Sequence, residues 1–122
     1  MKELCNEFGF TAGMLKGAMA DFDYDANAEN QLRSLIEWLK VNDIDAYLVL
    51  SPYHPGLYER MRNKKKAFLS IEHAYRQLAD ELKVAVFGSY DPSNVGCVAE
   101  EFYDGMHPKE LCMKKTLAPL LR

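Results

Sequence analysis

The clearest pattern of apolar residues lies between positions 27 and 41. Four apolar side chains recur there at spacings of three and four residues, which places them on one face of a helix: Leu32, Leu35, Ile36 and Leu39. Asn27 precedes this stripe and is of a residue type that favours the N-cap position. The pattern predicts a helix over residues 27–41 with one face buried.

Two later segments, residues 44–50 and 83–87, are apolar almost without interruption. A short apolar run that does not alternate with polar residues is typical of a strand buried on both faces, as in a parallel sheet covered by helices. Pro52 and Pro55 stop the first run, and Gly88 follows the second. We therefore predict two buried strands at these positions.

Between these strands, apolar residues keep helical spacing over residues 56–82: Leu57, Met61, Phe68, Ile71, Tyr75, Leu78 and Leu82. The lysines at residues 64–66 mark a possible break in this helix. Residues 1–26 have no steady period, because glycines interrupt their apolar residues. We expect a loop there, with a short helix around residues 12–20.

The predicted order is helix, strand, helix, strand and helix, which is the order of a parallel α/β layer structure. We expect one domain over residues 1–122 with a three-layer α/β/α fold and a small, mainly parallel sheet. In such folds ligands bind outside the carboxyl ends of the strands. Functional residues are therefore expected just after each strand.

Composition and charge exclude some functions. A chain of 122 residues that is 48% hydrophobic and 27% charged makes one globular domain. The net charge of −3 argues against nucleic-acid binding, and the basic run at residues 63–66 is interpreted as a solvated helix face. There is no apolar run of about 18 residues and no basic-then-apolar N-terminus, so we expect no membrane span and no signal peptide. Localisation stays open.

The three cysteines are Cys5, Cys97 and Cys112, an odd number without C-x-x-C spacing. This pattern indicates neither a disulfide framework nor a zinc site. We predict free thiols, with no metal site and no cofactor. For Cys112 a buried structural role is preferred over a nucleophilic one.

Asp104 and His107 stand three residues apart, and Pro108 follows them. A His that acts as a general base must be held in one tautomer, and a carboxylate that accepts its Nδ1 proton does this. Pro108 is expected in the first turn of a helix, where its missing N–H costs nothing. We predict a catalytic Asp–His pair; the alternative is that both residues cap local backbone.

Polar and aromatic residues follow both predicted strands: Ser51, Tyr53, His54, Ser89 and Tyr90. We expect them to meet the D-x-x-H turn at one rim and to contact a substrate there. For the two serines the alternative is a strand-end or turn hydroxyl, because neither lies in a G-x-S-x-G sequence. For His54 the alternative is a structural or solvent-exposed position.

Three segments together resemble the C-terminal part of the SGNH (GDSL-like) hydrolase superfamily, and most closely its branch of large, poorly characterised bacterial members. They are LVLSPYHP at residues 48–55, GSYD at 88–91 and FYDGMHP at 102–108. The resemblance covers about residues 27–122. It implies a partial SGNH-type, flavodoxin-like domain in which Asp104 and His107 are the Asp and His of a Ser-His-Asp triad.

The same resemblance also implies parts that this sequence does not contain. The superfamily's nucleophile lies in a Gly-Asp-Ser block and its oxyanion donors lie in two later blocks, but the chain has no Gly-Asp-Ser and no Gly-x-Asn-Asp. Where the superfamily tends to have a Gly five residues after the His, this chain has Cys112. The implied protein is a C-terminal fragment that carries two residues of a triad.

The expected function is therefore that of a serine esterase, or an O-acyl (acetyl) hydrolase or transferase, acting on a carbohydrate ester in a longer parent and inactive alone. The alternative is a non-catalytic binding or interaction module that keeps the fold. A sheet of two apolar strands has unpaired outer edges, which invite pairing with another chain. We therefore also expect a homo-oligomer.

Overall fold

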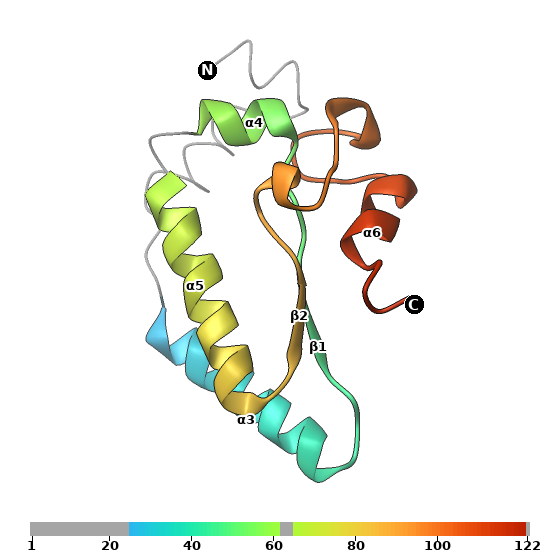
Figure 1. Cartoon of the computed structure of the whole chain (residues 1–122). Helices are drawn as coiled ribbons and strands as arrows, with labels where there is room; N and C mark the ends of the chain where they lie inside the picture. Colours follow the sequence, from blue (N-terminus) through green and yellow to red (C-terminus); the bar gives the residue numbers. More distant parts are fainter. Residues whose placement is uncertain (1–24, 62–64, 122) are drawn as a thin grey trace.

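The computed structural model describes residues 25–61 and 65–121. These residues form a mixed α/β structure with four α-helices and a two-stranded parallel sheet (Figure 1). The elements are α3 (Ala26–Val41), β1 (Tyr47–Leu50), α4 (Pro55–Arg60), α5 (Lys65–Leu82), β2 (Ala85–Gly88), the 3-10 turns η2 (Pro92–Asn94) and η3 (Ala99–Glu101), and α6 (Glu110–Thr116). The helix expected around residues 12–20 lies outside the described residues.

Helix α3 confirms the predicted helix but starts from a different cap. Asp25 is the N-cap, and its Oδ1 accepts hydrogen bonds from the N–H groups of Asn27 (2.9 Å) and Ala28 (3.3 Å). The prediction of Asn27 as N-cap is wrong, because the carboxylate two residues earlier reaches the free N–H groups and suits the positive end of the helix dipole. Of the predicted stripe, Ile36 is buried and Leu35 is exposed.

The predicted break at the lysines is confirmed, since α4 ends at Arg60 and α5 begins at Lys65. The predicted apolar stripe of α5 is also confirmed by the burial of Phe68, Ile71 and Leu78. This stripe lets α5 pack against both α3 and β2.

Both strands are shorter than predicted, because the preceding helices end in the same way. Asp43 and Lys83 follow α3 and α5 in the left-handed conformation, with φ of 56° and 57°. The next N–H then donates back to a helix carbonyl: Ile44 to Leu39, and Val84 to Ala79, both at 2.9 Å. These are Schellman-type helix ends, and they use residues that the apolar pattern assigned to strands.

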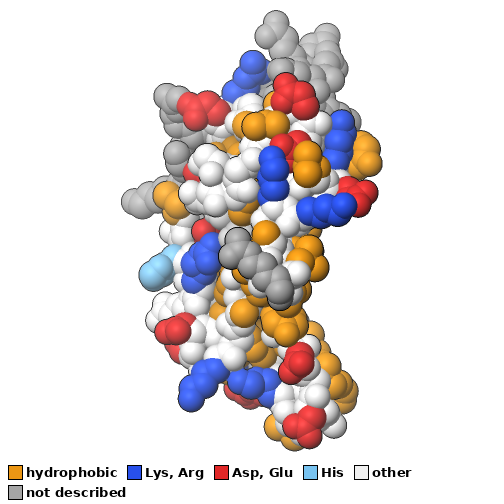
Figure 2. Space-filling view, turned by 45° about the vertical axis from the view of Figure 1, so that its right-hand side comes forward, with side chains coloured by type: hydrophobic (Ala, Val, Ile, Leu, Met, Phe, Trp, Pro, Cys, Tyr) orange, Lys and Arg blue, Asp and Glu red, His pale blue; other side chains and the backbone are white. Residues whose placement is uncertain are grey.

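The two strands pair in parallel from Tyr47 opposite Ala85 to Leu50 opposite Gly88. The prediction that both strands are buried on both faces is wrong: Ala85 of β2 is exposed, and Tyr47 and Val49 of β1 are 48% and 42% exposed. Alternate residues of a strand point to opposite faces, and the face that carries Tyr47 and Val49 is partly open. Figure 2 shows hydrophobic side chains gathered on the side of the molecule that lies to the right in Figure 1.

Helix α6 approaches the sheet at the end of β2. In Figure 1, α5 lies on one side of the strands and α6 on the other, and α3 crosses near the lower end of α5. Gly88 allows this approach: a Cβ there would lie 2.3 Å from the carbonyl oxygen of Leu50 and 2.7 Å from Cγ2 of Thr116 on α6. Its φ of 86° also favours glycine.

Candidate functional site

Hydrogen bonds join the three segments that were expected to meet at the carboxyl ends of the strands. The N–H of Tyr53, after β1, donates to the carbonyl of Tyr90, after β2, at 3.1 Å. The N–H of the next residue, His54, donates to the carbonyl of Gly105 in the D-x-x-H turn at 3.0 Å. The segment after β1 therefore lies between the other two and holds them together.

The D-x-x-H turn is closed as a short hairpin. Phe102 and Pro108 form an antiparallel bridge, and the N–H of Tyr103 donates to the carbonyl of His107 at 2.8 Å. We call residues 103–107 the Asp–His loop. Pro108 was expected in the first turn of a helix, and this prediction is wrong, because α6 begins at Glu110 and the bridge already takes up Pro108.

Asp104 contacts both the backbone of this loop and the ring of His107. Its Oδ1 accepts hydrogen bonds from the N–H of Met106 (2.8 Å) and from the N–H of His107 (2.9 Å). The two carboxylate oxygens also lie 2.8 and 2.7 Å from Nδ1 of His107. The turn-capping role and the His-orienting role therefore occur together in one side chain.

The electrostatics of the pair favour an ionised carboxylate. Partial burial opposes ionisation of Asp104, but the hydrogen bonds from Met106 and from His107 outweigh it and hold the pKa of this carboxyl below its usual value. The side chain of His107 is 73% exposed, against 31% for Asp104. Nδ1 is the ring nitrogen that contacts Asp104, which leaves Nε2 on the other side of a largely exposed ring.

His54 contacts the hairpin that carries the Asp–His loop. Its Nδ1 accepts a hydrogen bond from the N–H of Gly56 at 2.9 Å, which makes it the N-cap of α4. Its ring meets Phe102 edge-on, with centroids 5.5 Å apart. These contacts correspond to the structural alternative for His54, and its contact with a substrate stays a prediction.

Ser89 lies in a buried polar network. Its side chain donates a hydrogen bond to Oε1 of Glu72 at 2.9 Å and accepts one from Nδ2 of Asn94 at 3.1 Å. The second oxygen of Glu72 binds Arg76, which also donates to the carbonyl of Gly88 at 2.7 Å. The hydroxyl proton thus points to a carboxylate rather than to a His, which corresponds to the turn-hydroxyl alternative.

Glu72 is the residue of this region that sequence reasoning missed. It binds the N–H of Tyr90 at 3.0 Å as well as Ser89, and so ties α5 to the end of β2. The sequence held a weak signal for it, because Glu72 follows Ile71, which belongs to the apolar stripe of the predicted helix. Its partner is 17 residues away in the chain, and no local spacing indicates such a pair.

The remaining rim candidates differ in their surroundings. Ser51 is exposed just after β1. Tyr53 and Tyr90 pack together, with ring centroids 5.7 Å apart, and both contact Phe68 of α5. Burial raises the pKa of Tyr53, and burial together with nearby Tyr75, Tyr53 and Glu72 raises the pKa of Tyr90 to about 12.

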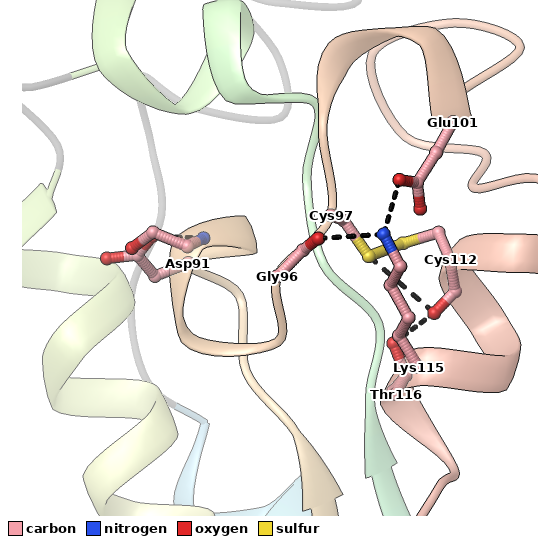
Figure 3. The surroundings of a disulfide bond; sticks show 8 residues. Asp91, Gly96, Cys97, Glu101, Cys112, Lys115 and Thr116 are labelled. Carbon is pink, nitrogen blue, oxygen red and sulfur yellow. Dashed lines mark hydrogen bonds and ion pairs between the residues drawn. A yellow bond between two sulfur atoms is a disulfide. The ribbon is translucent and has the colours of Figure 1, made fainter.

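Cys97 and Cys112 form a disulfide, so the prediction of free thiols is wrong for these two (Figure 3). They are 15 residues apart in the chain, yet their Cα atoms are only 5.3 Å apart, because α6 packs against η3. An odd number of cysteines without local spacing did not show this proximity. The disulfide brackets the Asp–His loop, and Cys5 lies outside the described residues.

Comparisons with known protein families, with curated proteins and with solved structures find no match for this chain. None of the helices in the described segments is both long enough and apolar enough to cross a membrane.

Proposed function

We propose that this chain supplies the Asp and the His of a serine-esterase site. It would correspond to the C-terminal part of an SGNH-type hydrolase or transferase that acts on an O-acyl ester of a carbohydrate, such as an O-acetyl group. The nucleophilic serine would come from a Gly-Asp-Ser segment of a longer parent, so the chain alone would be inactive.

The observation that carries the proposal is the contact between the Asp104 carboxylate and Nδ1 of His107, at 2.7 and 2.8 Å. A carboxylate in this position accepts the Nδ1 proton and leaves Nε2 as the basic nitrogen. The lowered pKa of Asp104 keeps the carboxylate charged for this task. Because the His107 side chain is 73% exposed, Nε2 is accessible to a hydroxyl from another segment.

The place of the loop in the fold adds support. It is tied to the segments that follow both parallel strands, which is where ligands bind in α/β folds. We interpret α6, on the side of the strands away from α5 in Figure 1, as part of a third layer. This interpretation agrees with a three-layer, partial SGNH-type domain.

In the proposed reaction, Nε2 of His107 takes the proton of the serine hydroxyl while the serine oxygen attacks the ester carbonyl. The His then gives that proton to the departing sugar oxygen, and an acyl-serine remains. Water, deprotonated by the same nitrogen, or a second hydroxyl would release the acyl group. Asp104 stabilises the imidazolium that forms in each step.

Two ester-hydrolysis assays test the proposal. The isolated chain should hydrolyse 4-nitrophenyl acetate no faster than an inert protein of similar size. A saturable rate that His107→Ala abolishes would contradict the claim that the nucleophile lies outside this chain. In the longer reading frame, His107→Ala should lower kcat by about 10³- to 10⁴-fold or more without changing the melting midpoint. His73→Ala, an exposed His on α5, is the matched control and should keep full activity.

The esterase proposal would be contradicted by a longer reading frame without Gly-Asp-Ser, or by a His107→Ala variant of the parent that keeps full activity. The second candidate is then a non-catalytic binding or interaction module. The observation that favours it is a set of exposed apolar side chains that no described element covers, among them Trp38 (58%), Tyr47 (48%) and Val49 (42%). Apolar surface of this kind is typical of an interaction site.

A further inference from the structure

A buried carboxylate lies against the disulfide that brackets the Asp–His loop. Glu101 is only 7% exposed, and Cys97 and Cys112 are 5% and 0% exposed. A carboxylate oxygen of Glu101 and the two sulfur atoms all lie within 4.8 Å of one another. Two sulfur ligands and one oxygen ligand are therefore gathered in a site that is closed to bulk solvent.

Among the described residues, only one of the two Glu101 oxygens has a hydrogen-bond partner. Oε1 accepts a hydrogen bond from Nζ of Lys115 at 2.6 Å, and Lys115 also donates to the carbonyl of Gly96 (Figure 3). Oε2 is buried and finds no hydrogen-bond partner within residues 25–61 and 65–121. A buried carboxylate oxygen without a hydrogen bond lowers the stability of the fold. An unpaired oxygen at this position therefore points to a ligand that binds in another state of the site.

We propose that, once the disulfide is reduced, Cys97, Cys112 and Glu101 bind one thiophilic divalent ion of the Zn²⁺ type. Thiolate and carboxylate oxygen are both zinc ligands, and three protein ligands leave the fourth tetrahedral position to a water molecule. The ion would give Oε2 the partner that it lacks. The sequence pattern gave no zinc signal, because the three ligands come together only through the packing of α6 on η3.

The reduction needs a two-electron reductant such as a dithiol or a phosphine. The Cys97–Cys112 bond breaks, and each sulfur gains one electron and one proton. A dithiol supplies both and becomes a disulfide, whereas a phosphine becomes its oxide and one water molecule supplies the oxygen and the two protons. Binding of the ion then releases both thiol protons. Two thiolates and one carboxylate carry three negative charges, which the ion and the Lys115 ammonium together neutralise.

In this proposal the site ties residues 97–101 to α6 in both redox states, through the Cys97–Cys112 bond or through the ion. The Asp–His loop lies between the tied segments, so its closure would persist under reducing conditions when the ion is present. The proposal does not depend on the esterase function, because it rests only on the sulfur and carboxylate groups.

Cobalt titration of the full chain tests it. The protein would carry Cys5→Ser, so that only the two relevant thiols remain, and would be kept reduced with a phosphine under anaerobic conditions. Co²⁺ should bind at one equivalent and give the near-ultraviolet thiolate-to-cobalt charge-transfer band with the visible bands of a tetrahedral site. Excess Zn²⁺ should abolish both signals.

Two neighbouring glutamates provide a matched pair of variants. Glu101→Gln should weaken Co²⁺ binding by more than the about 10- to 100-fold that loss of a supporting residue costs. Glu100→Gln, at the exposed residue beside it, should leave the affinity unchanged. Circular dichroism of both reduced proteins checks that they are folded. Absence of the charge-transfer band in folded, reduced protein, or equal affinities in the two variants, would overturn the proposal.

Discussion

At the scale of single residues, Asp104 combines two tasks that mutation can separate. Its Oδ1 accepts two backbone hydrogen bonds in the turn, and both oxygens lie against the His107 ring. An Asn can still accept the backbone bonds through its side-chain oxygen, whereas an Ala cannot. The two substitutions therefore test the turn and the ring contact separately.

We predict that Asp104→Ala lowers the free energy of unfolding by about 1 kcal/mol, the usual effect of losing such a cap. Asp104→Asn should leave the thermal midpoint nearly unchanged. Thermal melts of both variants, followed by circular dichroism, make the comparison. Equal, clear drops would show that the negative charge itself stabilises the turn, and no drop in either would show that the cap contributes nothing.

Gly88 is a second residue whose role follows from its geometry. A Cβ at this position would meet the Leu50 carbonyl and Thr116, in addition to the strain of a positive φ. We predict that Gly88→Ala destabilises the chain by more than about 1 kcal/mol. Gly96 is the matched control, because its φ is 77° but nothing lies within 4 Å of an added Cβ. A Gly96→Ala variant as unstable as Gly88→Ala would contradict the close approach of α6.

At the scale of elements, the two long helices α3 and α5 were predictable, whereas the start of α6 and the limits of the strands were not. The apolar stripe of α5 repeats within the helix itself, so it could be recognised without knowledge of any distant partner. The strands begin only where Asp43 and Lys83 end their helices in the left-handed conformation. Neither residue is a Gly, the residue that most often signals such a helix end.

The aromatic cluster between α5 and the strand ends makes the free energy of unfolding depend on pH in the alkaline range. Burial raises the pKa of Tyr53 and Tyr58, and the pKa of Tyr90 reaches about 12. A pKa above the unfolded value of about 10 means that the folded state favours the neutral phenol. This contribution is fully present below pH 10 and is lost as the pH rises through about 12.

We therefore predict that urea midpoints fall steadily between about pH 10 and pH 12. Tyr90→Phe should reduce this dependence, because the ring stays in the cluster without its titrating group. Tyr103→Phe, at an exposed tyrosine, is the control and should not reduce it. A pH dependence that is the same in all three proteins would contradict the assignment to the cluster.

At the scale of the whole molecule, one face of the sheet leaves apolar side chains exposed. In the described part of the chain, β1 and β2 pair only with each other, and Tyr47 and Val49 of β1 are partly exposed. Unpaired strand edges beside apolar side chains favour association. We predict a homodimer in which this face meets a second copy and buries more than about 1,000 Å² in total.

Light scattering at micromolar concentration tests the prediction. The wild type should show the mass of a dimer, and Val49→Glu should show that of a monomer. Leu69→Glu places the same charge at an exposed residue of α5 and should remain dimeric. A wild-type monomer that persists at all concentrations would contradict the prediction.

The part of the candidate site that depends on local sequence and on strand order was predictable, and the part that depends on distant contacts was not. Its Asp and His are three residues apart, so their contact could be expected from the spacing alone. The meeting of the segments after the strands followed from the parallel order. The Ser89–Glu72 bond and the Cys97–Cys112 bond join residues 17 and 15 positions apart, and only the packed structure brings them together.

The central claim is that Asp104 holds His107 ready to act as a base through Nε2. Nitrogen-15 NMR of the His107 ring in the isolated chain, at a pH where the ring is neutral, tests it most directly. The account predicts that the proton resides on Nδ1 in the wild type and that Asp104→Asn shifts the population toward the Nε2-protonated form. A ring already protonated on Nε2 in the wild type, or one unaffected by Asp104→Asn, would contradict the claim.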